Sequence, residues 1–81
     1  PAAFKNENMI AVAATDRNDQ LAQFSNYGKN SVHLAAPGVK ILSSTPGNSY
    51  KAASGTSMSC PHVAGAAAMI WAKHPAWSFK E

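Results

Sequence analysis

The stretch GTSMSCPHVAGAAAMIWAKH, residues 55–74, carries the pattern of one long helix. A helix over residues 57–74 would be about 27 Å long at a rise of 1.5 Å per residue. Pro61 lies near its start, where a missing N–H costs least, and Lys73 lies in its last turn, where a cation suits the helix dipole. Pro75 follows and cannot continue the helix. The sequence therefore predicts a helix over residues 57–74.

The middle of this predicted helix, residues 63–72, has no polar face. A helix at the surface of a globular protein has one apolar stripe, whereas a helix that is apolar all round lies inside a larger protein or a membrane. This run is about half as long as a membrane span requires, so we expect no membrane contact. Gly65 and the alanines beside it would let neighbouring backbones approach closely. We therefore expect a buried helix whose neighbours come mostly from outside this chain.

The residues before the helix predict short strands separated by turns and one loop. The strand candidates are the apolar or β-branched runs at residues 9–14, 32–35, 39–44 and 49–53. Turn-forming residues separate the later runs, at Pro37-Gly38 and at residues 46–48. Between the first two runs, residues 16–26 form a loop or hairpin, for which Leu21 and Phe24 are the predicted apolar anchors.

The composition indicates an incomplete hydrophobic core. Hydrophobic residues make up 46% of the 81, but 16 of them are alanine, which buries little surface. The single cysteine, Cys60, cannot close an intrachain disulfide. Ser78 and Glu81 have the spacing of a capping box, so a second helix would begin where the chain ends. We therefore expect residues 1–81 to be one portion of a larger domain and to fold poorly alone.

The charge pattern excludes one class of partner. Seven Lys and Arg against four Asp and Glu give a net charge of +3, and the basic residues are scattered singly along the chain. Nucleic-acid-binding proteins usually cluster such residues on one face or stripe. The sequence therefore predicts no nucleic-acid partner.

Ser57 has a position that favours nucleophilic chemistry. It lies at the start of the predicted helix, where unpaired N–H groups and the dipole favour negative charge. The backbone N–H of a serine there can stabilise the oxyanion of a tetrahedral intermediate. Gly55 suits a sharp turn into the helix, because it tolerates backbone conformations that side chains forbid. A helix N-cap is the other role for Ser57, and its position alone leaves both open.

The eleven residues Gly55–Gly65 closely resemble the serine motif of the subtilisin-like serine proteases, the subtilases. Three further segments resemble subtilase sequences in the same order: residues 8–16, 21–28 and 34–39. The motif is highly specific, because it comes with collinear flanking segments. The elbow motif of α/β-hydrolases does not fit, since its second glycine is missing, and neither does the β-lactamase motif, whose lysine is missing.

The resemblance implies an α/β fold, in which a parallel β-sheet is flanked by helices and Ser57 begins a buried helix. Residues 1–81 would then be the C-terminal portion of a single catalytic domain. The implied activity is that of a secreted or extracellular serine endopeptidase acting on proteins or peptides, with Ser57 as the nucleophile that forms the acyl-enzyme. The implied residues beside the substrate are Ser54, Gly55, Thr56 and Met58.

In subtilases the catalytic Asp and His and the oxyanion Asn precede the serine motif, so all three would lie upstream of Pro1. This chain alone is therefore expected to be inactive, and the missing N-terminal part of the domain is an expected partner. The alternative is a non-catalytic subtilase-like pseudoenzyme or binding module.

The remaining reactive side chains point to structural roles. His62 follows Ser57 by five residues on the helix, about 140° around it, and the resemblance implies that it is structural. His33 and His74 are predicted to be surface or packing residues, and Cys60 a small buried thiol. No pair has zinc-ligand spacing, so we expect neither metal nor cofactor here. Subtilases often bind structural calcium, but residues 29–33 carry no carboxylate for it.

Overall fold

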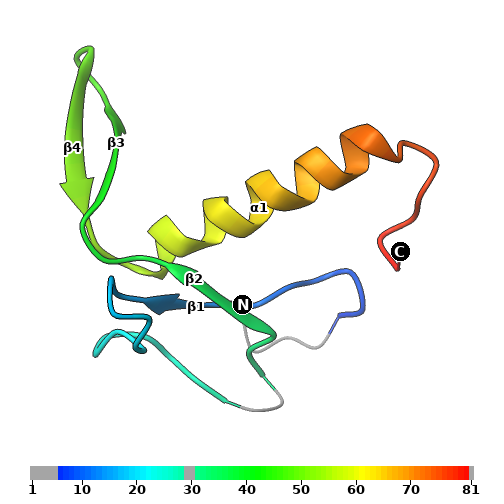
Figure 1. Ribbon diagram of the computed structural model, residues 1–81, viewed down its shortest axis with the longest axis horizontal. Helices are drawn as coiled ribbons and strands as arrows, with labels where there is room; N and C mark the ends of the chain where they lie inside the picture. The colour runs from blue at the N-terminus through cyan, green and yellow to red at the C-terminus, as the bar shows by residue number, and fades with distance from the viewer. Residues whose placement is uncertain (1–5, 29–30, 81) are drawn as a thin grey trace.

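The chain folds into two strand pairs and one helix. The computed structural model describes residues 6–28 and 31–80. In chain order, the elements are β1 (Val12–Thr15), β2 (Leu34–Pro37), β3 (Ile41–Thr45), β4 (Ser49–Ala53) and α1 (Thr56–Lys73). Figure 1 shows α1 running alongside the β1–β2 pair, with the β3–β4 hairpin standing away from both. The described part is thus a small α/β unit.

Strands β1 and β2 form a parallel pair that contacts α1. Five buried hydrophobic side chains form the core of this unit, and all are alanines: Ala11, Ala13, Ala14, Ala22 and Ala36. Methyl groups allow the helix to come close to the strands, but they bury little apolar area. The prediction of a thin, alanine-based core is confirmed for the described residues.

The parallel pair begins later along the chain than predicted, because a histidine side chain replaces one backbone partner. The N–H of Ala11 donates to the ring Nδ1 of His33 at 2.9 Å, while its carbonyl oxygen accepts from the N–H groups of His33 and Leu34 at 3.0 and 3.4 Å. The ladder therefore begins at Val12 and Leu34. The predicted strands at residues 9–14 and 32–35 are displaced toward the C-terminus, to the bounds of β1 and β2.

The loop after β1 is anchored by residues other than those predicted. Leu21 and Phe24 are 46% and 50% exposed, so their assignment as apolar anchors is wrong. Ala22 and Ser25 are buried instead. The N–H of Ala14 donates to Ser25 Oγ at 3.0 Å, and this hydroxyl donates in turn to the carbonyl oxygen of Asn26. A buried hydrogen bond, rather than a large apolar side chain, thus fastens the loop to β1.

Strands β3 and β4 form an antiparallel hairpin around the predicted turn at residues 46–48. Gly47 and Asn48 have φ angles of 86° and 60°, which glycine and asparagine adopt more readily than other residues. Strand β4 matches its predicted bounds, whereas β3 begins two residues later than predicted. Lys40 has a φ of 53°, so the chain turns there before the ladder starts.

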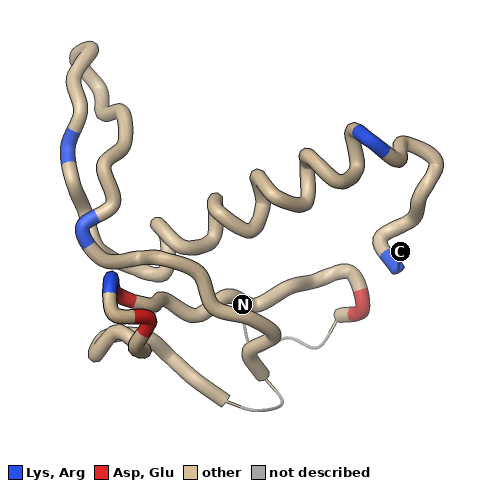
Figure 2. Tube along the Cα trace, in the orientation of Figure 1, with Lys and Arg blue, Asp and Glu red and all other residues tan. Residues whose placement is uncertain are grey.

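Charged residues are spread over several elements, as Figure 2 shows. Three of them lie in the loop after β1, two lysines lie on or beside the hairpin, and one lysine ends α1. An ion pair links distant parts of the described chain: Lys80 Nζ lies 3.9 Å from Glu7 Oε2, with both side chains largely exposed. An exposed pair of this kind contributes little to stability.

Helix α1 matches the predicted helix to within one residue at each end, but this chain leaves it uncovered. Ser59 is its one buried residue, while Met69, Ile70 and Trp71 are 76%, 56% and 63% exposed. No helix in residues 6–28 and 31–80 is long and apolar enough to cross a membrane.

A second helix was predicted to begin at Ser78. Residues 78–80 form no helix, since residues 79–80 are a turn, and Glu81 lies outside the described residues.

Candidate active site at the start of the helix

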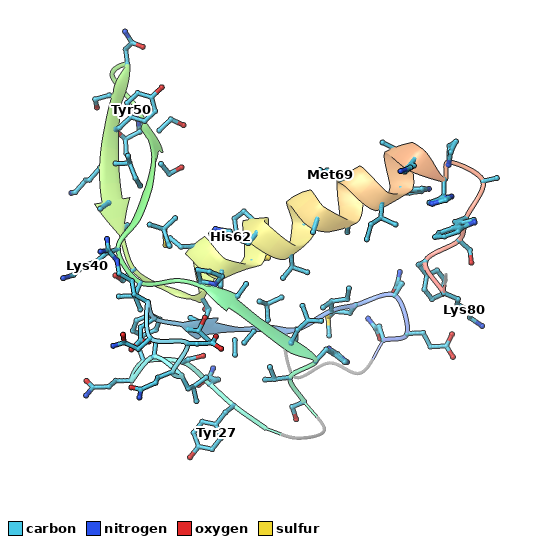
Figure 3. All side chains as sticks on the ribbon, in the orientation of Figure 1. Tyr27, Lys40, Tyr50, His62, Met69 and Lys80 are labelled. Carbon is cyan, nitrogen blue, oxygen red and sulfur yellow. The ribbon has the colours of Figure 1, made fainter. Side chains whose placement is uncertain are left out.

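Ser57 lies exposed in the first turn of α1 and faces a groove. The groove has a volume of about 320 Å³ and lies between α1 and strand β3. Its walls are Ser57, Met58, Pro61 and His62 from the helix and Ile41, Leu42 and Ser43 from the strand. Figure 3 shows His62 near the start of α1. The helix and the hairpin therefore both shape the space in front of the candidate nucleophile.

The helix begins at a glycine, so Ser57 is not its N-cap. Gly55 occupies the N-cap position and makes no side-chain cap hydrogen bond, while its carbonyl oxygen accepts from the N–H of Met58 at 3.0 Å. The first turn carries no acidic side chain. The positive end of the helix dipole is therefore not compensated by a carboxylate of α1, and this favours an anion beside Ser57.

The backbone of Gly55 adopts a conformation that other residues rarely reach, with φ 157° and ψ 163°. Replacing Gly55 by alanine should therefore destabilise the protein by about 1–3 kcal/mol, the usual range for such strain. The added Cβ would lie 3.5 Å from Met58 Sδ, an ordinary contact, so the loss of stability would come from backbone strain. Denaturant unfolding of Gly55→Ala measures the change in the free energy of unfolding. An unchanged midpoint and slope would show that the backbone there is not constrained.

A close contact between two glycines fixes the start of the helix to the sheet. The N–H of Gly55 donates to the carbonyl oxygen of Gly38 at 2.7 Å. The N–H of Gly38 donates in turn to the carbonyl oxygen of Thr15 at 3.0 Å. A Cβ built on Gly38 would lie 2.7 Å from both Ala14 Cβ and the carbonyl oxygen of Gly55. Only glycine fits there, so β1, the segment after β2 and the helix start form one continuous junction.

The residue beneath this junction is Ser59, which is fully buried. Its hydroxyl donates to the carbonyl oxygen of Thr56 at 2.9 Å and so has a partner despite its burial. The hydroxyl of Ser54 accepts from the N–H of Lys40 at 2.9 Å, which ties the segment before the helix to the base of the hairpin. The residues on either side of Ser57 are thus held in place, Ser59 by its burial against the sheet and Ser54 by its bond to the base of the hairpin.

The predicted substrate-binding residues lie in one continuous segment around Ser57. Ser54 is exposed between β4 and the helix, whereas Gly55, Thr56 and Met58 are half-buried at the helix start. Of these four, Met58 lines the groove together with Ser57. The predicted set is therefore close in space as well as in sequence.

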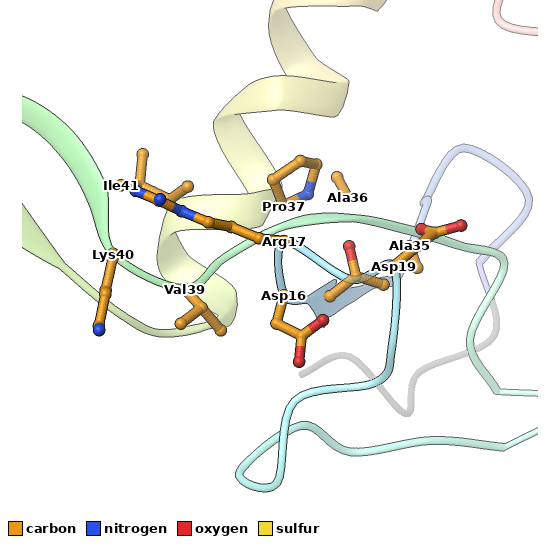
Figure 4. Close-up of a pocket in the computed structure, with 10 residues that line it drawn as sticks. Asp16, Arg17, Asp19, Ala35, Ala36, Pro37, Val39, Lys40 and Ile41 are labelled. Atoms are coloured by element: carbon orange, nitrogen blue, oxygen red, sulfur yellow. The ribbon is translucent and has the colours of Figure 1, made fainter.

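A second hollow was not predicted from the sequence. It has a volume of about 400 Å³ and lies at the carboxyl ends of β1 and β2, as Figure 4 shows, with Asp16, Arg17 and Asp19 on the loop side and Lys40 and Ile41 on the hairpin side. Ligands often bind at the carboxyl ends of parallel strands. The signal available in the sequence was a polar loop after one strand and a Pro-Gly turn after the next.

The three histidines have separate roles in the structure. His62 Nδ1 lies 3.0 Å from the carbonyl oxygen of Met58, and His33 Nδ1 accepts from the N–H of Ala11 as described above. His74 stacks on Trp77, with ring centroids 3.7 Å apart and planes 4° from parallel. All three thus support the backbone or packing.

No cluster of metal ligands is present among residues 6–28 and 31–80. Asp16 Oδ1 accepts from the N–H groups of Asn18 and Gln20, which engages that oxygen within its own loop.

Cys60, predicted to be buried, is exposed in this structure, because it lies on the part of α1 that the strands do not cover.

Comparison with known proteins identifies the family. The model of a family described as the subtilase family matches residues 1–81. The chain belongs to the subtilase family. This subtilase sequence is 51% identical over 71 residues to Subtilisin BL and to Subtilisin Savinase, both from Lederbergia lenta. It is 51% identical to an alkaline protease from Alkalihalobacillus alcalophilus and 48% identical to Subtilisin-like protease 2 from Plasmodium falciparum.

These matches cover most of this subtilase chain but a small part of each relative. Each covers 88% of the chain, but only 26% of the two subtilisins, 18% of the alkaline protease and 5% of the Plasmodium protein. The chain therefore spans about a quarter or less of the length of these relatives.

Proposed function

We propose that the protein containing this chain is a serine endopeptidase that cleaves proteins or peptides, with Ser57 as its nucleophile. The observation that carries the proposal is the position of Ser57, exposed at the start of α1 and lining a groove, within a chain of the subtilase family. The names of its relatives, which include an alkaline protease and two subtilisins, support the same activity.

The proposed chemistry is acyl transfer through a covalent intermediate. Ser57 Oγ attacks the scissile carbonyl carbon and loses its proton to a general base, which forms a tetrahedral oxyanion. The N–H of Ser57 donates to this oxyanion, and the uncompensated helix dipole stabilises the same charge. The C–N bond then breaks, the amine leaves with a proton from the base, and water hydrolyses the acyl-enzyme.

The chain is proposed to be the C-terminal portion of a single catalytic domain. The exposed apolar residues on α1, Met69, Ile70 and Trp71, support this proposal, because a complete domain would cover them. In that domain a parallel sheet flanked by helices would bury α1. The general base, its aspartate partner and a second oxyanion donor would come from residues outside this chain.

The proposed mechanism requires no cofactor, and no step passes through a metal. Asp16 Oδ1 accepts two N–H groups within its own loop. A structural calcium ion in the complete domain stays a prediction from the family resemblance. An extracellular location is proposed from family membership alone.

The test is covalent labelling with a fluorophosphonate, which reacts with activated serines. The complete protein should be labelled at Ser57, identified by mass spectrometry of the tryptic peptide, and should hydrolyse a peptide substrate. The 81-residue chain alone should not be labelled, because it lacks a general base. Absence of labelling in the complete, folded protein would contradict the proposal and favour a non-catalytic module.

Met58 is expected to make the activity sensitive to oxidation. It is half-buried beside Ser57 and lines the same groove, so a sulfoxide there would place a bulky polar group at the reaction centre. Peroxide treatment should lower kcat by about tenfold or more, as small displacements at a reacting centre do. Met58→Leu should keep kcat after the same treatment. Equal losses in both proteins would assign the damage to another residue.

A further inference from the structure

The side chain of His62 makes a contact that the proposed function does not use. Its Nδ1 lies 3.0 Å from the carbonyl oxygen of Met58, four residues earlier on α1. A carbonyl oxygen can only accept, so Nδ1 must carry the proton and donate it. His62 also lines the groove that contains Ser57 and Met58. The imidazole is therefore fastened to the turn of the helix that carries the candidate nucleophile.

This turn lacks one backbone hydrogen bond. In a regular α-helix the carbonyl oxygen of Ser57 would accept from the N–H of residue 61. Residue 61 is proline, which lies inside α1 and has no N–H to give. The first turn of the helix is consequently held less firmly at Ser57, the residue whose position matters most for the proposed reaction.

The contact from His62 strengthens the same turn at the next peptide group. The N–H of Met58 donates to Gly55, and the carbonyl oxygen of Met58 accepts from His62, so this residue is held at both its backbone groups. Because Met58 follows Ser57 directly, fixing it limits the motion of the Ser57 peptide as well. Ser57, which lines the groove, is thereby held in place together with Met58.

We propose that His62 is a positioning residue for Ser57, acting through the carbonyl group of Met58. This inference rests on the proposed function of Ser57 as a nucleophile. His62 transfers no proton in the reaction and its effect on turnover is indirect. Its ring N–H binds the peptide carbonyl that follows the one left without a helical donor by Pro61.

The test compares two substitutions of the same branched shape in the complete protein. The amide nitrogen of asparagine can occupy the place of Nδ1 and donate to Met58, whereas leucine cannot donate. His62→Leu should lower kcat about fivefold, the effect of losing one ordinary hydrogen bond, with KM within about twofold. His62→Asn should restore kcat to within about twofold of the unmodified protein. His74→Leu, at the far end of the same helix, is the control and should leave kcat unchanged.

Hydrogen exchange supplies a readout that does not depend on activity. Exchange of the backbone amides in residues 55–65, followed by mass spectrometry, should be faster in His62→Leu and unchanged in His62→Asn. If leucine changes neither kcat nor exchange, or if asparagine is as impaired as leucine, the positioning role is wrong. Failure of the unmodified protein to label at Ser57 would instead refute the proposed function, and exchange alone would then decide whether His62 holds the turn.

Discussion

Replacing Ser57 by alanine in the complete protein is expected to lower kcat by about a millionfold. This is the order of loss found when the nucleophilic serine is removed from the related protease subtilisin. The physical reason is that alanine has no oxygen to form the acyl-enzyme, so the covalent route disappears altogether. The same variant should lose fluorophosphonate labelling completely, because the label bonds to Ser57 Oγ.

The substitution should leave the fold intact, which separates chemistry from stability. Ser57 is exposed, and Gly55 rather than Ser57 caps the helix, so alanine removes no buried contact or cap. Thermal unfolding should be unchanged within about 0.5 kcal/mol, as for most exposed positions. Ser44→Ala, at an exposed serine on β3, is the matched control and should keep full turnover. Turnover by Ser57→Ala above about one per cent would require a different nucleophile.

Replacing Gly38 by alanine is expected to have the largest effect on stability. The new Cβ would lie 2.7 Å from Ala14 Cβ and 2.7 Å from the carbonyl oxygen of Gly55, and neither atom belongs to a flexible side chain. Overpacking of this kind costs about 3 kcal/mol or more, which in a domain of 150–250 residues lowers Tm by roughly 6–12 °C. Because Gly38 also holds Gly55, labelling at Ser57 should fall with stability.

Calorimetry of the complete Gly38→Ala protein measures the fall in Tm, and the rate of fluorophosphonate labelling measures the effect on Ser57. Gly28→Ala supplies the control, since its Cβ would lie no closer than 3.4 Å to any neighbour, and its Tm should change by less than about 2 °C. A Gly38→Ala protein with the Tm of the unmodified protein would mean that β1 and the helix start are farther apart than this structure places them.

Elements with local signals could be predicted from the sequence. The helix was predicted at residues 57–74 and lies at Thr56–Lys73, because an apolar run, a proline near its start and another just after its end define it locally. Strand β4 and the turn before it were also predicted with the correct bounds, since proline, glycine and asparagine specify the turn. The resemblance to subtilases was visible in the motif Gly55–Gly65 together with three collinear segments, and the family model that matches residues 1–81 shows the membership.

The features that could not be predicted from the sequence depend on contacts between distant residues. Leu21 and Phe24 were predicted to be anchors because they are large and apolar, yet the loop is fastened by Ser25, whose hydroxyl accepts from Ala14 eleven residues away. The start of β1 depends on the ring of His33, which no hydrophobic pattern reveals. The close approach at Gly38 is likewise visible only in three dimensions, since its sequence signal is that of an ordinary turn.

The alanine core has a consequence for protein engineering. Alanine has no side-chain rotamers, so the five buried methyl groups lose no side-chain entropy on folding and cannot rearrange to accept a larger neighbour. Any enlargement must move the backbone, and the backbone here carries the start of α1. Exposed polar positions on the hairpin are different, because Ser44 and Lys51 point to solvent and line no part of the groove. A mutant library that varies such positions would therefore keep more folded members than one that varies the buried alanines.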